Sequence, residues 1–232
     1  MENNIIQQNE AMLLFADISG YTQFVKKHGF EWAHGQFIIS EFLKSLLNEI
    51  KDPFKVAKLE GDAIFIYMPE TDHIRAAIFM DNILNFFKAF ENTKSKLASV
   101  NTCKCKSCCS LESLHLKLII HSGKILFYNI NQYQELSGID VIMLHRLSKN
   151  SVTGKKYILI TEQAFNKIGS LNDLEFIKGK EKYDEIGEIK TFIHYPNIKL
   201  NENLIYVKKP LRILKIFFKI KLLFYTLIKG FN

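Results

Sequence analysis

The sequence predicts an α+β fold, with a ferredoxin-like βααββαβ sheet that carries helices on one face. A short, continuous apolar run at residues 11–16 ends in a turn, as a buried strand does. Two β-rich runs flank residues 60–62, which predicts a hairpin. Apolar residues recur at spacings of three and four over residues 39–50, which predicts a helix that packs against this sheet.

The other elements follow in the order that this plan needs. A second amphipathic helix precedes a polar loop at about residues 92–112, which contains all four cysteines. The further expected elements are strands at 114–121 and 124–130, a helix that ends near 147, a strand at 157–160, a helix at 162–168 and three short strands that end near 194.

The composition fits one large domain. The chain has 232 residues, of which 47% are hydrophobic, enough to bury a sizeable core. We expect an N-terminal extension at residues 1–9, the folded domain at 10–196 and a basic tail at 197–232. The clustered cysteines favour a cytoplasmic location over a secreted disulfide framework. We expect no secretory signal, because the chain does not open with basic residues followed by an apolar run.

The positive charge belongs to the tail. The net charge is +7, but residues 208–232 contain seven of the 31 basic residues and no acidic one. The remaining 24 basic residues equal the 24 acidic residues in number. A neutral body argues against a broad phosphate-backbone footprint, so we expect no nucleic-acid partner.

Asp17 and Asp62 are the candidate metal ligands. Asp17 directly follows the predicted buried strand, and Asp62 lies in the predicted hairpin turn. If the two strands are neighbours, the carboxylates converge, and Mg²⁺ prefers one or two carboxylates together with substrate phosphates. The alternative is that both aspartates only form turns, because aspartate is common in turns without any ligand.

The residues around both aspartates resemble two motifs of the class III adenylate and guanylate cyclases. Residues 14–22 (LFADISGYT) resemble the first motif and residues 58–62 (KLEGD) the second. The resemblance implies that Asp17, Asp62 and the backbone carbonyl of Ile18 bind Mg²⁺ or Mn²⁺. The residues it implies for triphosphate binding, through backbone N–H groups at a helix start, are Ser19, Gly20, Tyr21 and Thr22.

Because class III cyclases build each site at a homodimer interface, the resemblance also implies residues from a partner protomer. Lys58 matches the family's base-contacting lysine, and Glu135 lies at the position of the base-selecting acid. Arg146 matches the arginine that stabilises the transition state. The implied reaction is attack of the ribose 3′-OH of a nucleoside triphosphate on its α-phosphate, with release of pyrophosphate.

Two positions depart from the cyclase pattern. Ile142 stands at the position of the ribose-orienting asparagine, and Ile186 at that of a late phosphate-contacting lysine. Loss of one preorganised donor costs on the order of 10²–10³ in rate. His145, beside Arg146, is a candidate substitute, although a solvent-facing or core histidine is the simpler interpretation.

The chain also resembles a narrower, uncharacterised bacterial group of cyclase-like proteins. The shared features are residues 17–20, residues 60–64, a Cys-x-Cys-x-x-Cys loop, His121-x-Gly123 and residues 145–150. This resemblance covers about residues 10–195, and isoleucine at position 142 is normal within the group. It implies a fold and no activity of its own.

The cysteine loop (residues 103–109) is a second candidate metal site. Structural zinc takes four Cys or Cys/His ligands in tetrahedral geometry, here with His115 or a partner chain completing the set. The alternatives are a redox-sensitive loop, in which the flanking Lys104 and Lys106 favour thiolates, and a loop with incidental thiols. The four candidate residues are Cys103, Cys105, Cys108 and Cys109.

The tail predicts a basic amphipathic helix. Arg212, Lys215, Lys219 and Thr226 share one helical face, and apolar residues fill most of the rest. Such a helix is typical of one that lies on an anionic membrane surface, here through residues 208–232 on the inner face of the membrane. Docking onto a groove of the protein or of its dimer mate is the equal alternative, and a true span ranks behind both.

Three functions remain open on the sequence alone. The first is a homodimeric, Mg²⁺-dependent nucleotidyl cyclase, and the second is a nucleotide-binding regulatory module without turnover. The third is a membrane-associated, metal-stabilised interaction domain. The retained Asp17, Asp62 and Arg146 favour the first two, whereas Ile142 and Ile186 favour the second over the first.

Overall fold

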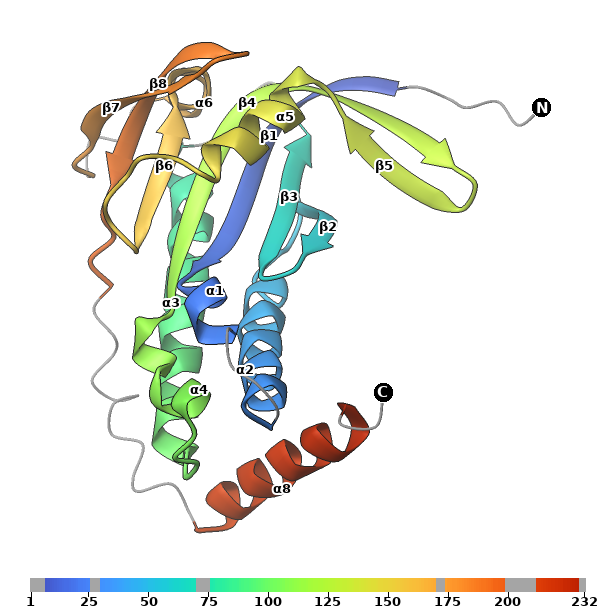
Figure 1. The fold of residues 1–232 in the computed structure, drawn as a ribbon. Helices are drawn as coiled ribbons and strands as arrows, with labels where there is room; N and C mark the ends of the chain where they lie inside the picture. Colours follow the sequence, from blue (N-terminus) through green and yellow to red (C-terminus); the bar gives the residue numbers. More distant parts are fainter. Residues whose placement is uncertain (1–6, 26–29, 70–75, 170–173, 199–211, 230–232) are drawn as a thin grey trace. The chain divides into compact units, whose positions relative to one another are not determined.

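The structure is a computed structural model that describes residues 7–25, 30–69, 76–169, 174–198 and 212–229 (Figure 1). The chain divides into two compact units. The first comprises residues 1–17, 50–83 and 116–196, and the second comprises residues 18–49, 84–115 and 197–232.

An eight-stranded sheet dominates the described part of the first unit. Its order is β2-β3-β1-β4-β6-β8-β7, and β5 pairs with β4 beside this path. The strands are β1 (Gln7–Ser19), β2 (Lys55–Glu60), β3 (Ala63–Pro69), β4 (His115–Ile130), β5 (Tyr133–Ser137), β6 (Tyr157–Thr161), β7 (Ile177–Tyr183) and β8 (Gly187–His194).

The order of the first four strands agrees with the ferredoxin-like prediction. In the sheet, β1 lies between β3 and β4, and β2 lies on the outer side of β3. β1 pairs with β3 in antiparallel register, whereas β4 and β6 are parallel. The expected α+β class, a sheet with helices packed on one face, is confirmed.

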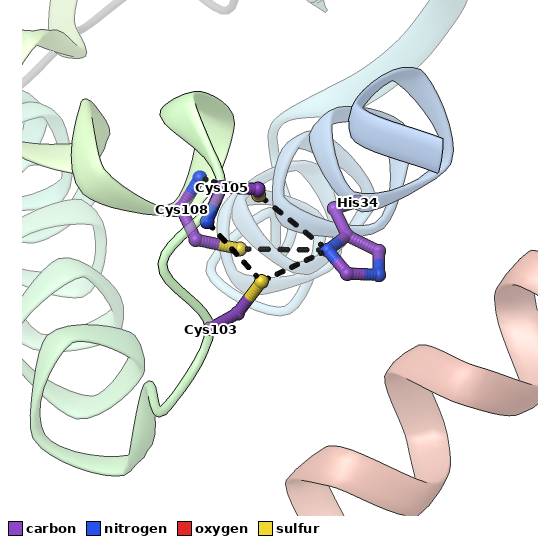
Figure 2. Close-up of side chains that lie close together, drawn as sticks. All are labelled: His34, Cys103, Cys105 and Cys108. Carbon is purple, nitrogen blue, oxygen red and sulfur yellow. Dashed lines mark hydrogen bonds between the residues drawn. The ribbon is translucent and has the colours of Figure 1, made fainter. Parts of the chain in front are cut away.

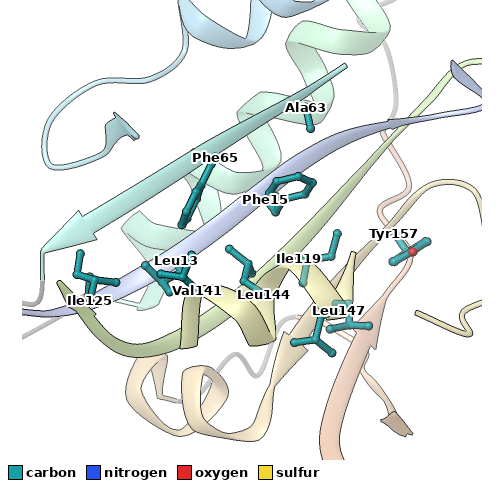
Figure 3. Close-up of a cluster of buried hydrophobic side chains, with 12 residues drawn as sticks. Leu13, Phe15, Ala63, Phe65, Ile119, Ile125, Val141, Leu144, Leu147 and Tyr157 are labelled. Atoms are coloured by element: carbon teal, nitrogen blue, oxygen red, sulfur yellow. The ribbon is translucent and has the colours of Figure 1, made fainter. Parts of the chain in front are cut away.

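One hydrophobic core of the first unit lies between the sheet and α5 (Ile139–Leu147), as Figure 3 shows. Val141, Leu144 and Leu147 are buried at spacings of three, so α5 presents one apolar stripe. The residues that the strands contribute to this cluster are Ala11, Leu13, Phe15, Ala63, Phe65, Ile119, Ile125, Tyr157 and Leu159. The core therefore places α5, with His145 and Arg146 in its last turn, over the strands that carry the aspartates.

The second unit is helical in its described part. Its elements are α1 (Tyr21–Val25), α2 (Phe30–Leu47), most of α3 (Ala76–Val100), α4 (Lys106–Cys109), the 3₁₀ turn η1 (Leu111–Ser113) and α8 (Arg212–Lys229). Phe42 of α2 stacks on Phe90 of α3 with ring centroids 4.2 Å apart. Because aromatic pairs add to plain area burial, this contact helps to fix the two helices together.

Three local expectations differ from the structure. The two strands expected at 114–121 and 124–130 are one continuous strand, β4, because Gly123 makes room for a neighbour and does not turn the chain. The hairpin strand β5 was not expected, and among the described residues two strands, β7 and β8, stand where three short strands were expected. The polar loop begins later than expected, since α3 continues to Val100.

Gly123 is required by the carboxylate of Asp140. A Cβ atom at position 123 would overlap that carboxylate, which accepts a 2.7 Å hydrogen bond from the backbone N–H of Lys124. The other carboxylate oxygen lies 3.0 Å from Nε2 of the fully buried His121, whose Nδ1 lies 2.9 Å from Thr161 Oγ1. His121-x-Gly123 is thus a structural motif that attaches the start of α5 to β4.

Candidate functional site

The aspartate pair (Asp17 and Asp62) comes together at one end of the β1–β3 strand pair. Asp17 lies opposite Ala63 in the antiparallel register, and Asp62 directly precedes Ala63 in the turn between β2 and β3. Gly61 allows that turn, because its φ of +64° is costly for other residues. The two strands are neighbours, which is the condition that the convergence of the carboxylates required.

The surroundings of the aspartate pair disfavour two negative charges there. Burial raises the pKa of Asp62 to about 7, and the negative charge of Asp17 adds to the rise. With a pKa of about 7, the Asp62 carboxyl is mostly protonated below neutral pH, and a nearby positive charge favours its ionised form. Two carboxylate side chains also form a donor set that suits Mg²⁺ or Mn²⁺, so the residues present fit the metal that the fold family implies.

Lys117 of β4 already supplies part of that positive charge. Its Nζ lies 2.7 Å from Asp17 Oδ2 and donates a 2.9 Å hydrogen bond to the carbonyl of Ser148. It also lowers the pKa of Asp62, although burial and Asp17 outweigh it. Sequence reasoning missed Lys117, whose only signal is that β4 is a neighbour of β1 in the sheet.

The predicted triphosphate turn, at residues 19–22, belongs to the second unit. Gly20 has a φ of +92°, and a Cβ atom on it would lie 2.8 Å from the carbonyl oxygen of Ser113. Ser19 ends β1, and α1 begins at Tyr21, whose hydroxyl accepts a hydrogen bond from Gln36. Ile18 is buried and Thr22 is exposed. The local form is therefore the strand–turn–helix that the sequence predicted.

The structure brings the two predicted base-reading residues together. Lys58 Nζ lies 3.3 Å from Glu135 Oε2, although the residues are 77 positions apart in the sequence. Lys58 is on β2 and Glu135 is on the unexpected strand β5. Both side chains are substantially exposed, so the pair contributes little to stability and remains accessible to a ligand.

The two candidate residues of α5, His145 and Arg146, lie in different environments. Arg146 is exposed and forms an ion pair with Glu185 at 3.2 Å. His145 packs edge-on against the rings of Phe15 and Phe65, and its Nδ1 lies 3.7 Å from Glu60. His145 is thus partly a core residue, as the simpler interpretation held.

The two departures from the cyclase pattern lie at different places. Ile142 is 50% exposed on α5, where it offers no hydrogen bond to a ligand. Ile186 lies in the turn between β7 and β8, and its backbone N–H bonds to the carbonyl of Tyr183. Neither side chain can replace the polar group expected at its position.

The second unit contains a cysteine–histidine cluster: His34, Cys103, Cys105 and Cys108 (Figure 2). His34 is on α2, and the three cysteines belong to the loop between α3 and α4 and to α4 itself. Cys109 is exposed and lies outside the group, and the described structure places His34 where His115 or a partner chain was expected. Sequence reasoning missed His34, because one histidine 69 positions from Cys103 gives no spacing signal.

Burial is the main influence on the pKa values of two thiols in this cluster. It raises the pKa of Cys108, and hydrogen bonds and charge from Cys105 and Cys103 add to the rise. It raises the pKa of Cys105 as well. The expectation that Lys104 and Lys106 favour the thiolates is therefore wrong for these two thiols, because desolvation dominates.

The tail helix α8 packs against α2 within the second unit. Phe218 and Leu222 are buried, and the ring of Phe218 meets that of Phe37 with centroids 5.7 Å apart. Lys221 forms an ion pair with Glu41 at 3.3 Å, and a groove of about 790 Å³ runs along these helices. None of the described helices is both long and apolar enough to cross a membrane. Residues 199–211, with the basic residues at 208 and 209, lie outside the described part.

A sequence-family profile matches the middle of the chain. The profile of a family described as "Protein of unknown function (DUF2652)" matches residues 39–157. An uncharacterized protein of Mycobacterium tuberculosis, Rv2561/Rv2562, is 30% identical over 124 residues. That alignment covers 53% of this chain and 57% of the relative, so this chain spans little more than half of the relative's length.

Comparison with solved structures gives the fold. The guanylyl cyclase Cya2 superposes with a TM-score of 0.65 at 13% identity, covering 81% of this chain and 92% of that one. The adenylyl cyclase CyaB from P. aeruginosa gives 0.62 at 12% identity, with 84% and 97% covered. The guanylate cyclase domain of RhGC from Catenaria anguillulae, in complex with GTP, gives 0.55 at 15% identity, with 81% and 97% covered. The fold is that of the class III cyclase domains.

Proposed function

The chain belongs to the DUF2652 family, and we propose that it binds a nucleoside triphosphate together with Mg²⁺ or Mn²⁺ at Asp17 and Asp62. The observation that carries the proposal is the convergence of these carboxylates at one end of β1 and β3, with the pKa of Asp62 raised to about 7. Loss of the Asp62 proton gives the pair a second negative charge, which a divalent cation would offset while it also binds the phosphates.

The turn between β1 and α1 is our candidate for the phosphates. Ser19, Gly20, Tyr21 and Thr22 would donate backbone N–H groups, as a strand–turn–helix commonly does to anions. Ile18 would add its carbonyl to the metal ligands. In a relative of the same fold, the guanylate cyclase domain of RhGC, GTP is bound, which supports a triphosphate as the ligand.

We propose a homodimer in which Lys58, Glu135 and Arg146 serve the partner's nucleotide. The contact between Lys58 and Glu135 supports a shared role in reading the base. Large apolar side chains are exposed on the same unit, as expected of a surface that a second protomer covers. They include Val56, Leu59, Ile130, Tyr133, Ile139 and Ile142.

The reaction that such a site supports is closure of the triphosphate to a 3′,5′-cyclic nucleotide with release of pyrophosphate. Bound cations would lower the pKa of the attacking ribose hydroxyl and offset charge on the leaving group. Arg146 would stabilise the charge that develops on the α-phosphate. Its ion pair with the exposed Glu185 is weak enough to exchange for a phosphate.

A second candidate function, nucleotide binding without turnover, is favoured by one observation. Ile142 and Ile186 both lack the polar group that a cyclase uses at these positions, and His145 is engaged with Phe15 and Phe65. Two missing donors at about 10²–10³ in rate each would leave binding with very slow chemistry. Such a protein would act in signalling as a nucleotide sensor.

One experiment separates the two functions. Purified protein is incubated with each of the four nucleoside triphosphates and Mn²⁺ or Mg²⁺, and cyclic product is sought by mass spectrometry, with Asp62→Ala as the control. Product that disappears in Asp62→Ala supports the enzyme. Triphosphate binding that requires Asp62 but yields no product supports the sensor, and absence of binding contradicts both.

For the tail we propose a location in the cytoplasm, with α8 on the inner face of an anionic membrane. One side of α8 packs on α2, and the apolar residues left exposed are Ile213, Leu214, Ile216, Phe217, Ile220, Leu223, Phe224 and Leu227. Lys215 and Lys219 supply positive charge along the same helix. Co-sedimentation with anionic liposomes tests this. Equal partitioning of the wild type and a Lys215→Glu/Lys219→Glu variant would exclude the electrostatic part of the proposal.

A further inference from the structure

We propose that Nδ1 of His34 and the sulfur atoms of Cys103, Cys105 and Cys108 bind one zinc ion that holds the second unit together. This site is separate from the aspartate pair, and it stands or falls independently of nucleotide binding. All four residues belong to the second unit, so the proposal rests on one compact part of the chain.

The distances in the cluster are those of a tetrahedral site. His34 Nδ1 lies 3.5 Å from Cys103 Sγ, 3.6 Å from Cys105 Sγ and 3.8 Å from Cys108 Sγ. Zinc bonds of about 2.3 Å to sulfur and about 2.0–2.1 Å to nitrogen, at tetrahedral angles, separate nitrogen from sulfur by about 3.6 Å. All four ligand atoms lie within 4.8 Å of one another, which leaves the centre of the group within reach of each.

The ligand types select zinc and a structural role. Thiolates and imidazole are soft or intermediate donors, which favour zinc over the magnesium that carboxylates prefer. Four protein ligands close the coordination shell, whereas a catalytic zinc keeps one position open for water or substrate. Binding would displace the protons of the three thiols, and no electrons are transferred.

The surroundings compensate the charge of such a site. Zinc with three thiolates carries a net negative charge of about one. Lys104 and Lys106 flank Cys105 in the sequence and are exposed, so they can balance this charge from solvent. The backbone N–H of Cys105 donates to Cys103 Sγ at 3.5 Å, and that of Cys108 donates to Cys105 Sγ at 3.4 Å. N–H donors to sulfur stabilise the thiolate form of a metal ligand.

The zinc would join segments that are far apart in the sequence. His34 is near the start of α2, and the cysteines follow α3. Next to His34, Gly35 lies beside the ring of Phe24 of α1 and the hydroxyl of Ser107, since a Cβ atom there would lie 3.4 Å and 3.7 Å from them, in ordinary van der Waals contact. Asn101 further fixes the loop, by accepting from Cys103 N and donating to the carbonyl of Cys108. One ion would therefore hold α1, α2 and the loop in place.

The test begins with the full-length wild type, purified with reductant and analysed for metal by mass spectrometry. We expect about one zinc per chain, either as purified or after anaerobic reconstitution with zinc. With Co²⁺ in its place, the protein should show the absorption of a tetrahedral thiolate site. X-ray absorption at the zinc edge should give a shell of three sulfurs and one nitrogen, a readout that needs no variant.

Variants then assign the ligands. Cys105→Ser, Cys108→Ser and His34→Ala should each lower the zinc content or affinity by at least about tenfold, as the loss of a ligand does. Cys109→Ser is the matched control and should retain full zinc. Wild-type protein that binds no zinc after reconstitution, or that shows disulfides among these cysteines under reductant, would overturn the proposal. Equal loss in Cys109→Ser would overturn the assignment of ligands.

Discussion

The aspartate pair and the cysteine–histidine cluster are two candidate metal sites built on opposite chemistry. The first offers two hard carboxylates near Lys117, and the second offers three thiols and an imidazole at tetrahedral spacing. An incomplete set of hard ligands suits a cation that arrives with substrate phosphates, whereas a complete set of soft ligands suits a cation that stays. Ligand number, as well as ligand type, therefore distinguishes the site proposed for a nucleotide-bound cation from the site proposed for a structural one.

The largest expected effect is that of Asp62→Ala on the first site. Because the variant removes one of two carboxylates that would hold the cation, we expect Mn²⁺-dependent triphosphate binding to weaken by at least about 100-fold. Fluorescence titration with a labelled triphosphate measures this. Asp184→Ala, which changes an exposed carboxylate in the turn between β7 and β8, is the control and should bind normally. The comparison breaks down if Asp62→Ala binds as the wild type does.

The next effect concerns the second site and stability. Loss of zinc in Cys108→Ser should cost at least about 2 kcal/mol of folding free energy, or about 4–8 °C in melting temperature for a chain of this size. Cys109→Ser should melt within about 1 °C of the wild type. Thermal melts with and without a chelator measure both. A chelator that leaves the wild-type melting temperature unchanged would argue against a structural ion.

A smaller effect is the pH dependence of the first site. The folded-state pKa of Asp62 is about 7, above its ordinary value of 3.8, so between these two pH values the cation-free folded protein holds a proton that the unfolded chain has lost. Its contribution to stability is therefore complete below about pH 4 and lost as the pH rises through about 7. Since a cation must displace this proton, Mn²⁺ affinity should rise about tenfold per pH unit below pH 7 and then level off.

Calorimetric titration of Mn²⁺ from about pH 5 to pH 8 tests this dependence. Asp62→Asn should bind weakly at every pH in the range, because it has no proton to lose. If the wild type has a flat profile, the proton is not on Asp62, and the electrostatic argument for the cation loses its main support.

The smallest effect is expected for Lys117→Met. Lys117 lowers the pKa of Asp62, so its removal should shift the midpoint of the Asp62 titration upward by a fraction of a pH unit. Carboxyl-carbon NMR of the cation-free protein measures that midpoint. Lys178→Met, a change of an exposed lysine on β7, should leave it in place. A downward shift in Lys117→Met would mean that Lys117 does not compensate the aspartate pair.

The sequence was most informative where the chemistry lies close together in the chain. The local pattern identified Asp62 in the turn between β2 and β3, and it identified Asp17 near the end of the first strand, although β1 continues past Asp17 to Ser19. The α+β class and the order of the central strands also follow from local elements, because few topologies connect them.

The features that the sequence did not predict depend on contacts between segments that are far apart in the sequence. His34 completes a cluster from another helix, and Lys117 reaches Asp17 only because β4 lies beside β1. Gly123 resembles a turn residue in the sequence, yet it lies inside β4, where Asp140 occupies the space of its missing side chain. No local periodicity carries such information.

The central claim, a cation and a triphosphate at the aspartate pair, is tested most directly by electron paramagnetic resonance of Mn²⁺. The signal of free Mn²⁺ is followed while protein is added with a non-hydrolysable triphosphate analogue. We predict that wild-type protein removes more free Mn²⁺ than the analogue alone does, and that an Asp17→Ala/Asp62→Ala variant does not. Equal signals for the wild type and this variant would contradict the account.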